Sequence, residues 1–114
     1  MKFERELLKG VAPVVVLEIL SRGQMYGYEL SQAIEQRSGS ILTLGKGTLY
    51  PLLYNLEAKG LVTAEVQESE NKRKRRYYSI TSKGRNVLST QKEQWLKLNE
   101  AVNLVFTFGG VRTA

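Results

Sequence analysis

The chain of 114 residues contains no cysteine, no histidine and no aspartate. Without cysteine it can form neither a disulfide framework nor a thiolate metal site. Without histidine and aspartate, the Ser-His-Asp and Cys-His catalytic arrangements and the usual zinc ligand sets are also excluded. The segment Gly45-Lys46-Gly47-Thr48 has the residue types of a phosphate-binding loop but not its spacing, so we interpret it as the start of a helix. We therefore expect a protein that is not an enzyme and that holds no metal and no cofactor.

Long hydrophobic runs are also absent. The longest uninterrupted one, Val11–Leu17, is far shorter than the ~20 residues that a membrane-spanning helix needs. The first ten residues mix charges and lack the apolar segment of a signal peptide. The length corresponds to one domain. We expect a single cytoplasmic domain.

The positive charge is unevenly placed. The formal net charge is +6, and residues 46–114 supply all of the excess, with twelve basic and six acidic side chains. A domain with localised basic charge is typical of proteins that bind a polyanion. Nucleic acid is the first candidate and an anionic membrane surface is the second.

Hydrophobic periodicity predicts three helices, a β-hairpin and a long last helix. The first helix should cover residues 4–21, with a break at Pro13 or with its proper start near Val11, because a proline biases the preceding residue away from helical angles. The others should cover about residues 26–37 and 47–59, the strands about 61–67 and 76–80, and the last helix 81–106, capped by Thr81 or Ser82. Alternation along the strands places Val66 and Tyr78 on the inner face of the hairpin.

This order of elements predicts a mainly α fold with a small β-hairpin, a winged helix-turn-helix. Residues 1–80 would form the DNA-binding domain, 81–108 a C-terminal dimerisation helix and 109–114 a flexible tail. Because two strands alone are not stable, we expect the hairpin to pack on the helices.

The third predicted helix has a narrow buried stripe and an unusual outer surface. Its stripe consists of Leu49, Leu52, Leu53 and Leu56. Tyr50 and Tyr54 flank this stripe, Pro51 and Asn55 lie opposite to it, and Thr48 and Lys46 stand at the entry. Pro51 removes no hydrogen bond if the helix begins at Gly47 or Thr48. The outer side chains either contact DNA, with Lys46 on a phosphate, or the tyrosines merely complete the core and the proline merely starts the helix.

Five consecutive cations, Lys72, Arg73, Lys74, Arg75 and Arg76, occupy the tip and the return strand of the predicted hairpin. Such a run is often only a solvated face or a nuclear localisation signal. Beside a DNA-reading helix, however, it is typical of a wing that binds phosphates. Because strand residues alternate, we do not expect all five to bind.

The last predicted helix has a heptad seam, formed by Leu88, Gln91, Trp95, Leu98, Val102 and Val105. Too little chain remains to cover such a seam, so we predict a homodimer through this helix. Trp95 is either a core residue of that interface or the wall of a hydrophobic ligand pocket between the subunits.

Several of these motifs together resemble the PadR family of bacterial transcriptional regulators, over roughly residues 8–106. The resemblance rests on Tyr26-Gly27-Tyr28-Glu29-Leu30, on Gly47-Thr48-Leu49-Tyr50-Pro51-Leu52-Leu53 and on Lys74-Arg75-Arg76-Tyr77-Tyr78. The short C-terminal part resembles the smaller subfamily, which includes multidrug-responsive repressors.

The resemblance implies a winged-helix dimer that represses from a palindromic operator until a small hydrophobic effector releases it. It implies DNA contacts for Thr48, Tyr50 and Pro51, for Tyr28 on the supporting helix, and for Lys74 and Arg75 in the wing. It also implies that Trp95, with Val15 of the first helix, lines a flat effector pore at the dimer interface. The alternative is a protein–protein adaptor that keeps the winged-helix shape but does not read DNA.

Overall fold

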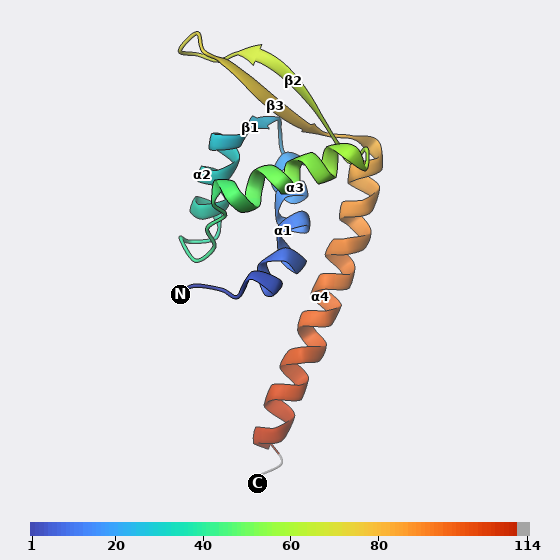
Figure 1. Cartoon of the computed structure of the whole chain (residues 1–114). Helices are drawn as coiled ribbons and strands as arrows, with labels where there is room; N and C mark the ends of the chain where they lie inside the picture. The colour runs from blue at the N-terminus through green and yellow to red at the C-terminus, as the bar shows by residue number, and fades with distance from the viewer. Residues whose placement is uncertain (112–114) are drawn as a thin grey trace.

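The computed structural model describes the backbone of residues 1–111 and the side chains of residues 1–108. The elements follow the order α1 (Arg5–Leu20), β1 (Met25–Tyr26), α2 (Gly27–Arg37), α3 (Lys46–Ala58), β2 (Val62–Glu68), β3 (Lys74–Ile80) and α4 (Ser82–Val111) (Figure 1). This confirms the predicted mainly α, winged-helix fold. No helix in the described part of the chain is both long enough and apolar enough to cross a membrane.

The core is formed where α1, α2 and α3 meet the sheet. Its fully buried side chains are all aliphatic and come from these helices, the sheet and the segment before α3: Val16, Leu17, Leu20, Leu30, Ile34, Leu44, Leu49, Leu53 and Val62.

The predicted break at Pro13 is wrong, because α1 continues through the proline. Ala12 before the proline and Val16 after it are both buried, so packing on both sides keeps the helix together despite its missing hydrogen bond.

The sheet has three strands in the order β1-β3-β2, all antiparallel. The two-stranded hairpin predicted from the sequence is therefore incomplete. Its missing member, β1, is only two residues long and pairs Met25 with Tyr78 and Tyr26 with Tyr77. A strand of two residues is too short to show an alternating pattern of apolar and polar residues, so the sequence did not predict it. The predicted inward position of Val66 is wrong: its side chain is exposed, and so is that of Arg76, its partner across the hairpin.

The helix α3 begins one or two residues earlier than predicted, at Lys46. Pro51 is therefore its sixth residue, and it lacks the N–H that would normally be donated to the carbonyl group of Gly47. The prediction that this proline removes no hydrogen bond is thus wrong. The predicted leucine stripe is confirmed, with Leu49, Leu53 and Leu56 buried and Leu52 half-buried.

The last helix, α4, is anchored to the domain only by its first turns. The hydroxyl of Thr81 accepts the N–H of Gly84 at 2.9 Å, as the predicted cap requires, and donates to the carbonyl of Gly60 at 2.7 Å. Leu88 is buried, but from Ser89 to Phe108 every side chain is exposed. The helix projects away from the domain and continues past its predicted end near Phe106 to Val111 (Figure 1). Of the tail predicted at 109–114, residues 112–114 lie outside the described part.

Candidate nucleic-acid interface

The outer surface of α3 carries the side chains that the sequence placed there. Tyr54 is 65% exposed and Tyr50 is 36% exposed, on the side toward the sheet. Thr48, Pro51 and Asn55 are also exposed, on the side toward the first residues of the chain. Lys46 is exposed at the first residue of the helix. The helix thus presents two tyrosines on one flank and a hydroxyl and an amide on the other.

Tyr50 is the less exposed of the two tyrosines because its ring lies against the start of α2. A Cβ atom added at Gly27 would lie 2.8 Å from the Cε1 and Cζ atoms of this ring. No side chain other than hydrogen fits at residue 27 while Tyr50 keeps its position. The glycine therefore has a packing role that its place in the sequence did not reveal.

Next to Gly27, the first turn of α2 presents Tyr28, which is 61% exposed. Its hydroxyl accepts a hydrogen bond of 2.9 Å from the amide of Gln32, one turn later. The carboxylate of Glu29 accepts the backbone N–H of Tyr26 at 3.2 Å and so fixes the start of the helix. Tyr28 is thus exposed at the first turn of α2 and is linked to the next turn through Gln32.

The wing consists of β2, β3 and the turn between them. The five consecutive cations in it fall into two groups, which differ in whether other side chains of the domain hold them. Lys72, Arg73 and Lys74 are exposed and form no ion pair within the described residues; we call them the wing-tip cations. The turn is closed by the N–H of Ser69, which donates to the carbonyl of Arg73 at 2.8 Å. Lys72 adopts a φ of 64°, in the left-handed region. The wing tip thus presents three cations to a partner.

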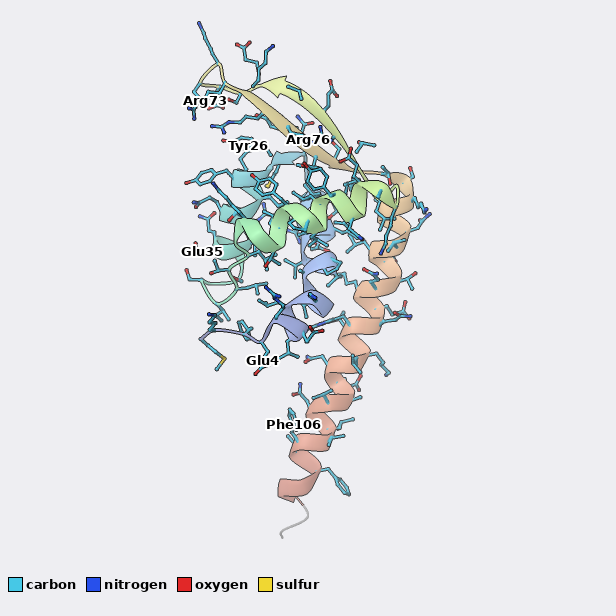
Figure 2. The ribbon with its side chains drawn as sticks, viewed as in Figure 1. Glu4, Tyr26, Glu35, Arg73, Arg76 and Phe106 are labelled. Carbon is cyan, nitrogen blue, oxygen red and sulfur yellow. The ribbon has the colours of Figure 1, made fainter. Side chains whose placement is uncertain are left out.

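The other two cations are held by the domain itself. Arg76 donates two hydrogen bonds to the carboxylate of Glu57 in α3, at 3.0 and 3.1 Å (Figure 2 labels Arg76, Tyr26 and Arg73). The guanidinium carbon of Arg75 lies 4.9 Å from the centre of the Tyr26 ring, and that ring in turn meets the edge of Tyr77. These contacts orient the wing relative to α2 and α3. Alternation along the strand predicted that Arg76, and with it Lys74, would point differently from Arg75, but the domain holds both Arg75 and Arg76 and leaves Lys74 exposed.

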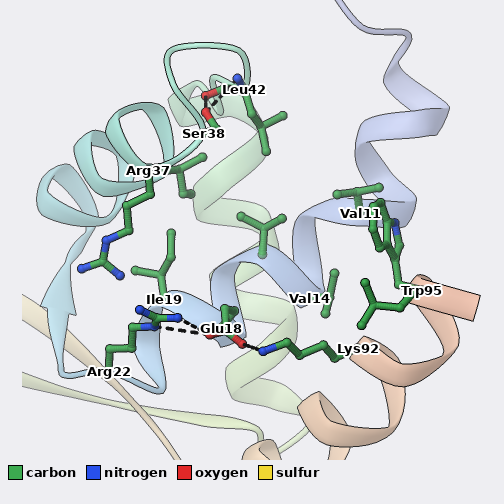
Figure 3. A pocket seen from close by; sticks show the side chains of 13 residues that line it. Val11, Val14, Glu18, Ile19, Arg22, Arg37, Ser38, Leu42, Lys92 and Trp95 are labelled. Carbon is green, nitrogen blue, oxygen red and sulfur yellow. Dashed lines mark hydrogen bonds and ion pairs between the residues drawn. The ribbon is translucent and has the colours of Figure 1, made fainter. Parts of the chain in front are cut away.

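A groove of about 610 Å³ separates α4 from α1 and α2, and we call it the α1–α4 groove (Figure 3). Both residues that the resemblance placed at an effector pore, Trp95 and Val15, line it. Its remaining apolar lining includes Val11, Val14, Ile19, Ile34, Leu42 and Leu96. Arg22, Arg37 and Lys92 contribute positive charge, against the single carboxylate of Glu18. The groove is thus mainly apolar and carries an excess of positive charge.

Glu18 links α4 to α1 at the side of this groove. Its carboxylate accepts hydrogen bonds from Lys92 at 2.8 Å and from Arg22 at 3.1 Å. The hydrogen bond from Lys92 makes the largest contribution and, with the one from Arg22, lowers the pKa of Glu18 below its ordinary value of 4.5. Desolvation of the carboxylate opposes this shift without cancelling it. Nothing along the sequence indicates this link, because Glu18 and Lys92 are 74 positions apart.

We predict that Glu18→Gln lowers the free energy of unfolding at pH 7 by up to about 1 kcal/mol, since the two cationic partners are more than half exposed. Because the pKa in the folded chain is depressed, the stabilisation is complete above the ordinary value and is lost as the pH falls through the folded-state value. Urea unfolding at pH 7 and at pH 3 measures this. Glu93→Gln, at an exposed carboxylate without an ion pair in the described part, is the control. A difference between the two variants that persists at pH 3 would exclude an ionic origin.

Beyond Leu88, the apolar side chains of α4 from Trp95 to Phe106 are exposed. Of the predicted seam, Leu98 is 64% exposed and Val105 is 71% exposed, whereas Leu88 belongs to the core of the domain. Phe106 is 74% exposed and is labelled in Figure 2. The projecting part of α4 thus exposes a series of large apolar side chains.

Among the described residues, no group of His, Cys, Asp and Glu side chains could hold a metal ion.

The residues 16–90 match the model of the "Transcriptional regulator PadR-like family". An uncharacterized protein of Lysinibacillus sphaericus is 30% identical over 99 residues, which are 87% of this chain and 91% of that protein. A transcriptional regulator of Escherichia coli is 33% identical over 93 residues, 82% of this chain but 43% of the regulator.

Solved structures are similar over most of the chain. A PadR-like transcriptional regulator from Bacillus cereus has a TM-score of 0.77 and 33% identity, covering 89% of this chain and 96% of that one. A transcriptional regulator from Clostridium thermocellum has a TM-score of 0.78 and 28% identity, covering 86% and 95% of the two chains.

Proposed function

Because this chain belongs to the PadR-like family of transcriptional regulators, we propose that it is a cytoplasmic, homodimeric repressor that binds a palindromic operator and is released by a small hydrophobic effector. The observation that carries the proposal is the surface shared by α3 and the wing. The wing-tip cations, which form no ion pair within the described residues, and two exposed tyrosines of α3 lie on elements that the Arg76–Glu57 ion pair joins. An adaptor that does not bind nucleic acid would have no use for the wing-tip cations.

In the proposed complex, α3 enters the major groove and the wing lies along the phosphate backbone. Tyr50, Tyr54 and Thr48 would contact bases, sugars or phosphates, and the rigid Pro51 would pack on the bases. Lys46, Tyr28 and the wing-tip cations would contact phosphates. Arg75 would reach the DNA only by leaving the Tyr26 ring, so its predicted contact competes with that stacking.

The test of DNA binding is a fluorescence-anisotropy titration with the DNA upstream of the gene and with a shuffled sequence of equal composition. We expect salt-sensitive binding to both and a clear preference for the upstream DNA. Tyr50→Ala should weaken binding to the upstream DNA more than to the shuffled DNA. Equal affinity of the wild-type protein for the two sequences would contradict sequence-specific reading.

Gly27→Ala should weaken operator binding by about tenfold, an effect of the order of a single base contact. The new methyl group would displace the Tyr50 ring without requiring the backbone to move. In a Tyr50→Ala background the same substitution should have no further effect, and this double-mutant cycle is the control. Additive effects in the cycle would show that Gly27 does not act through Tyr50.

The proposed dimer forms through α4. Trp95, Leu98, Val102 and Val105, with Gln91, would meet the same helix of the partner, and Leu88 would support this seam from within the domain. Since recognition helices of dimers meet successive major grooves about 34 Å apart, such pairing would fit a palindromic operator. Sedimentation velocity should show a dimer for the wild-type protein and a monomer for Leu98→Glu.

The proposed effector binds in the α1–α4 groove against Trp95 and Val15. We predict that planar aromatic compounds quench the fluorescence of Trp95, the only tryptophan, in a saturable way. Compounds with one acidic group should bind more tightly than cationic ones with the same ring, because three cations and one carboxylate line the groove. Free N-acetyltryptophanamide controls for collisional quenching. Unchanged fluorescence across neutral, acidic and basic compounds would exclude the effector but not DNA binding.

A further inference from the structure

A second concave surface lies beside α3, on the side away from the wing. It has a volume of about 800 Å³, and we call it the N-terminal cleft. One wall consists of the first residues of the chain, including Lys2, Arg5 and Lys9. The other wall is the flank of α3 that carries Gly47, Thr48 and Asn55. One flank of α3, with Thr48, Pro51 and Asn55, therefore lines this cleft.

The wall formed by the first residues is seated on the domain. Phe3 is half-buried, and the partly buried Leu8 packs against the core. The cationic side chains of this segment, Lys2, Arg5 and Lys9, remain exposed. Figure 2 labels Glu4 in the same segment, at the residue that precedes α1.

The cleft is lined by cations and by no carboxylate among the described residues. Lys2 and Arg5 form no ion pair within this part of the chain. Lys9 is 3.9 Å from Glu6, and both side chains are largely exposed, so this pair is weak. On the facing wall, the hydroxyl of Thr48 and the amide of Asn55 offer hydrogen-bond donors. Cations with hydroxyl and amide donors are the groups that bind phosphate oxygens.

The cleft and the wing lie on opposite flanks of α3. In Figure 1 the tip of the wing lies above this helix and the N-terminus lies below it, both toward the end of the domain that holds the start of α3. An α-helix with its side chains is about 10–12 Å across, and the major groove of B-DNA is about 12 Å wide. A helix that fills the groove is therefore bordered by a phosphate backbone on each side.

We propose that the N-terminal cleft binds the phosphate backbone along the groove edge opposite to the wing, with Lys2, Arg5 and Lys9 as its phosphate contacts. The proposal rests on the proposed DNA binding by α3 and assigns to this chain a second set of contacts. It makes α3 a helix clamped from both sides, with the wing-tip cations on one backbone and the cleft cations on the other.

The test compares two triple variants that remove the same charge. The cleft variant is Lys2→Ala, Arg5→Ala and Lys9→Ala; the control variant is Lys83→Ala, Arg85→Ala and Lys97→Ala, at exposed positions of α4. Binding to the upstream DNA is measured by anisotropy at several salt concentrations. Relative to the control, the cleft variant should lower the slope of log K against log salt by about 0.9 for each phosphate that is no longer neutralised. Ethylation interference should lose the signals along the groove edge that faces the cleft and keep those along the edge that the wing-tip cations contact.

Equal slopes for the two variants would overturn the proposal. The proposal would also fail if sedimentation velocity showed that the cleft variant no longer forms a dimer, because the cleft would then bind a second copy of the chain. If the wild-type protein itself does not bind the DNA, the proposed function fails, which is a different result. Unchanged circular dichroism and melting temperature show that the cleft variant is folded.

Discussion

Gly84→Ala should lower the free energy of unfolding by about 3 kcal/mol, a loss typical of overpacking in a core that cannot yield. The methyl group would press against the backbone carbonyl of Leu61 and lie 2.8 Å from the Cγ1 atom of Ile80. Backbone atoms cannot rotate away as a side chain can. The contact joins the first turn of α4 to the start of the wing, so the substitution should also loosen the projecting helix. Urea unfolding at a fixed protein concentration measures the effect.

Gly47→Ala is the matched control. Gly47, like Gly84, lies in the first turn of a helix, but an added Cβ atom would meet nothing within 4 Å. Since alanine is the better helix former, we expect the stability of this variant to be unchanged or raised by up to about 1 kcal/mol. If both variants lose the same free energy, the close approach of α4 to Leu61 is not the cause.

The second large effect concerns the wing-tip cations. The triple variant Lys72→Ala, Arg73→Ala and Lys74→Ala should weaken binding to operator and to shuffled DNA by on the order of a hundredfold or more at about 0.1 M salt. The reason is that three phosphates per protomer would no longer be neutralised, so fewer counterions would be released on binding. The slope of log K against log salt should fall by about 2.7 for each protomer. Specificity should change little, since phosphate contacts carry no base information.

Arg76→Gln gives a contrast within the same strand. The guanidinium group of Arg76 is already held by Glu57, so the substitution removes an exposed ion pair, and such pairs contribute little to stability. We expect a small effect on affinity and an unchanged salt slope. A slope that falls as steeply for Arg76→Gln as for one wing-tip cation would show that Arg76 leaves Glu57 to bind DNA.

The features predicted well from the sequence are those with a local cause. The leucine stripe of α3 sets its buried side, and Thr81 caps α4 through its own hydroxyl. The alternation of the return strand places Tyr78 inward, where it is buried. Each of these depends on residues within a few positions of one another, so period and residue type suffice.

The features that were missed depend on partners far apart in the chain. The glycine at 27 is explained only by the ring of Tyr50, and the cations at 75 and 76 only by Tyr26 and Glu57. The helix α1 passes through Pro13 because tertiary packing outweighs a local preference. The strand β1 exists only because β3 pairs with it. No pattern along the sequence encodes such contacts.

Hydroxyl-radical footprinting of the wild-type protein on the DNA upstream of its gene is the sharpest test of dimeric, sequence-specific DNA binding. We expect two protected regions related by two-fold symmetry, with centres about one helical turn apart, because each protomer would insert one α3 into a major groove. Protection should weaken steeply as salt rises. A single unsymmetric protected region, or no protection at a salt concentration where the protein is folded and dimeric, would contradict this mode of binding.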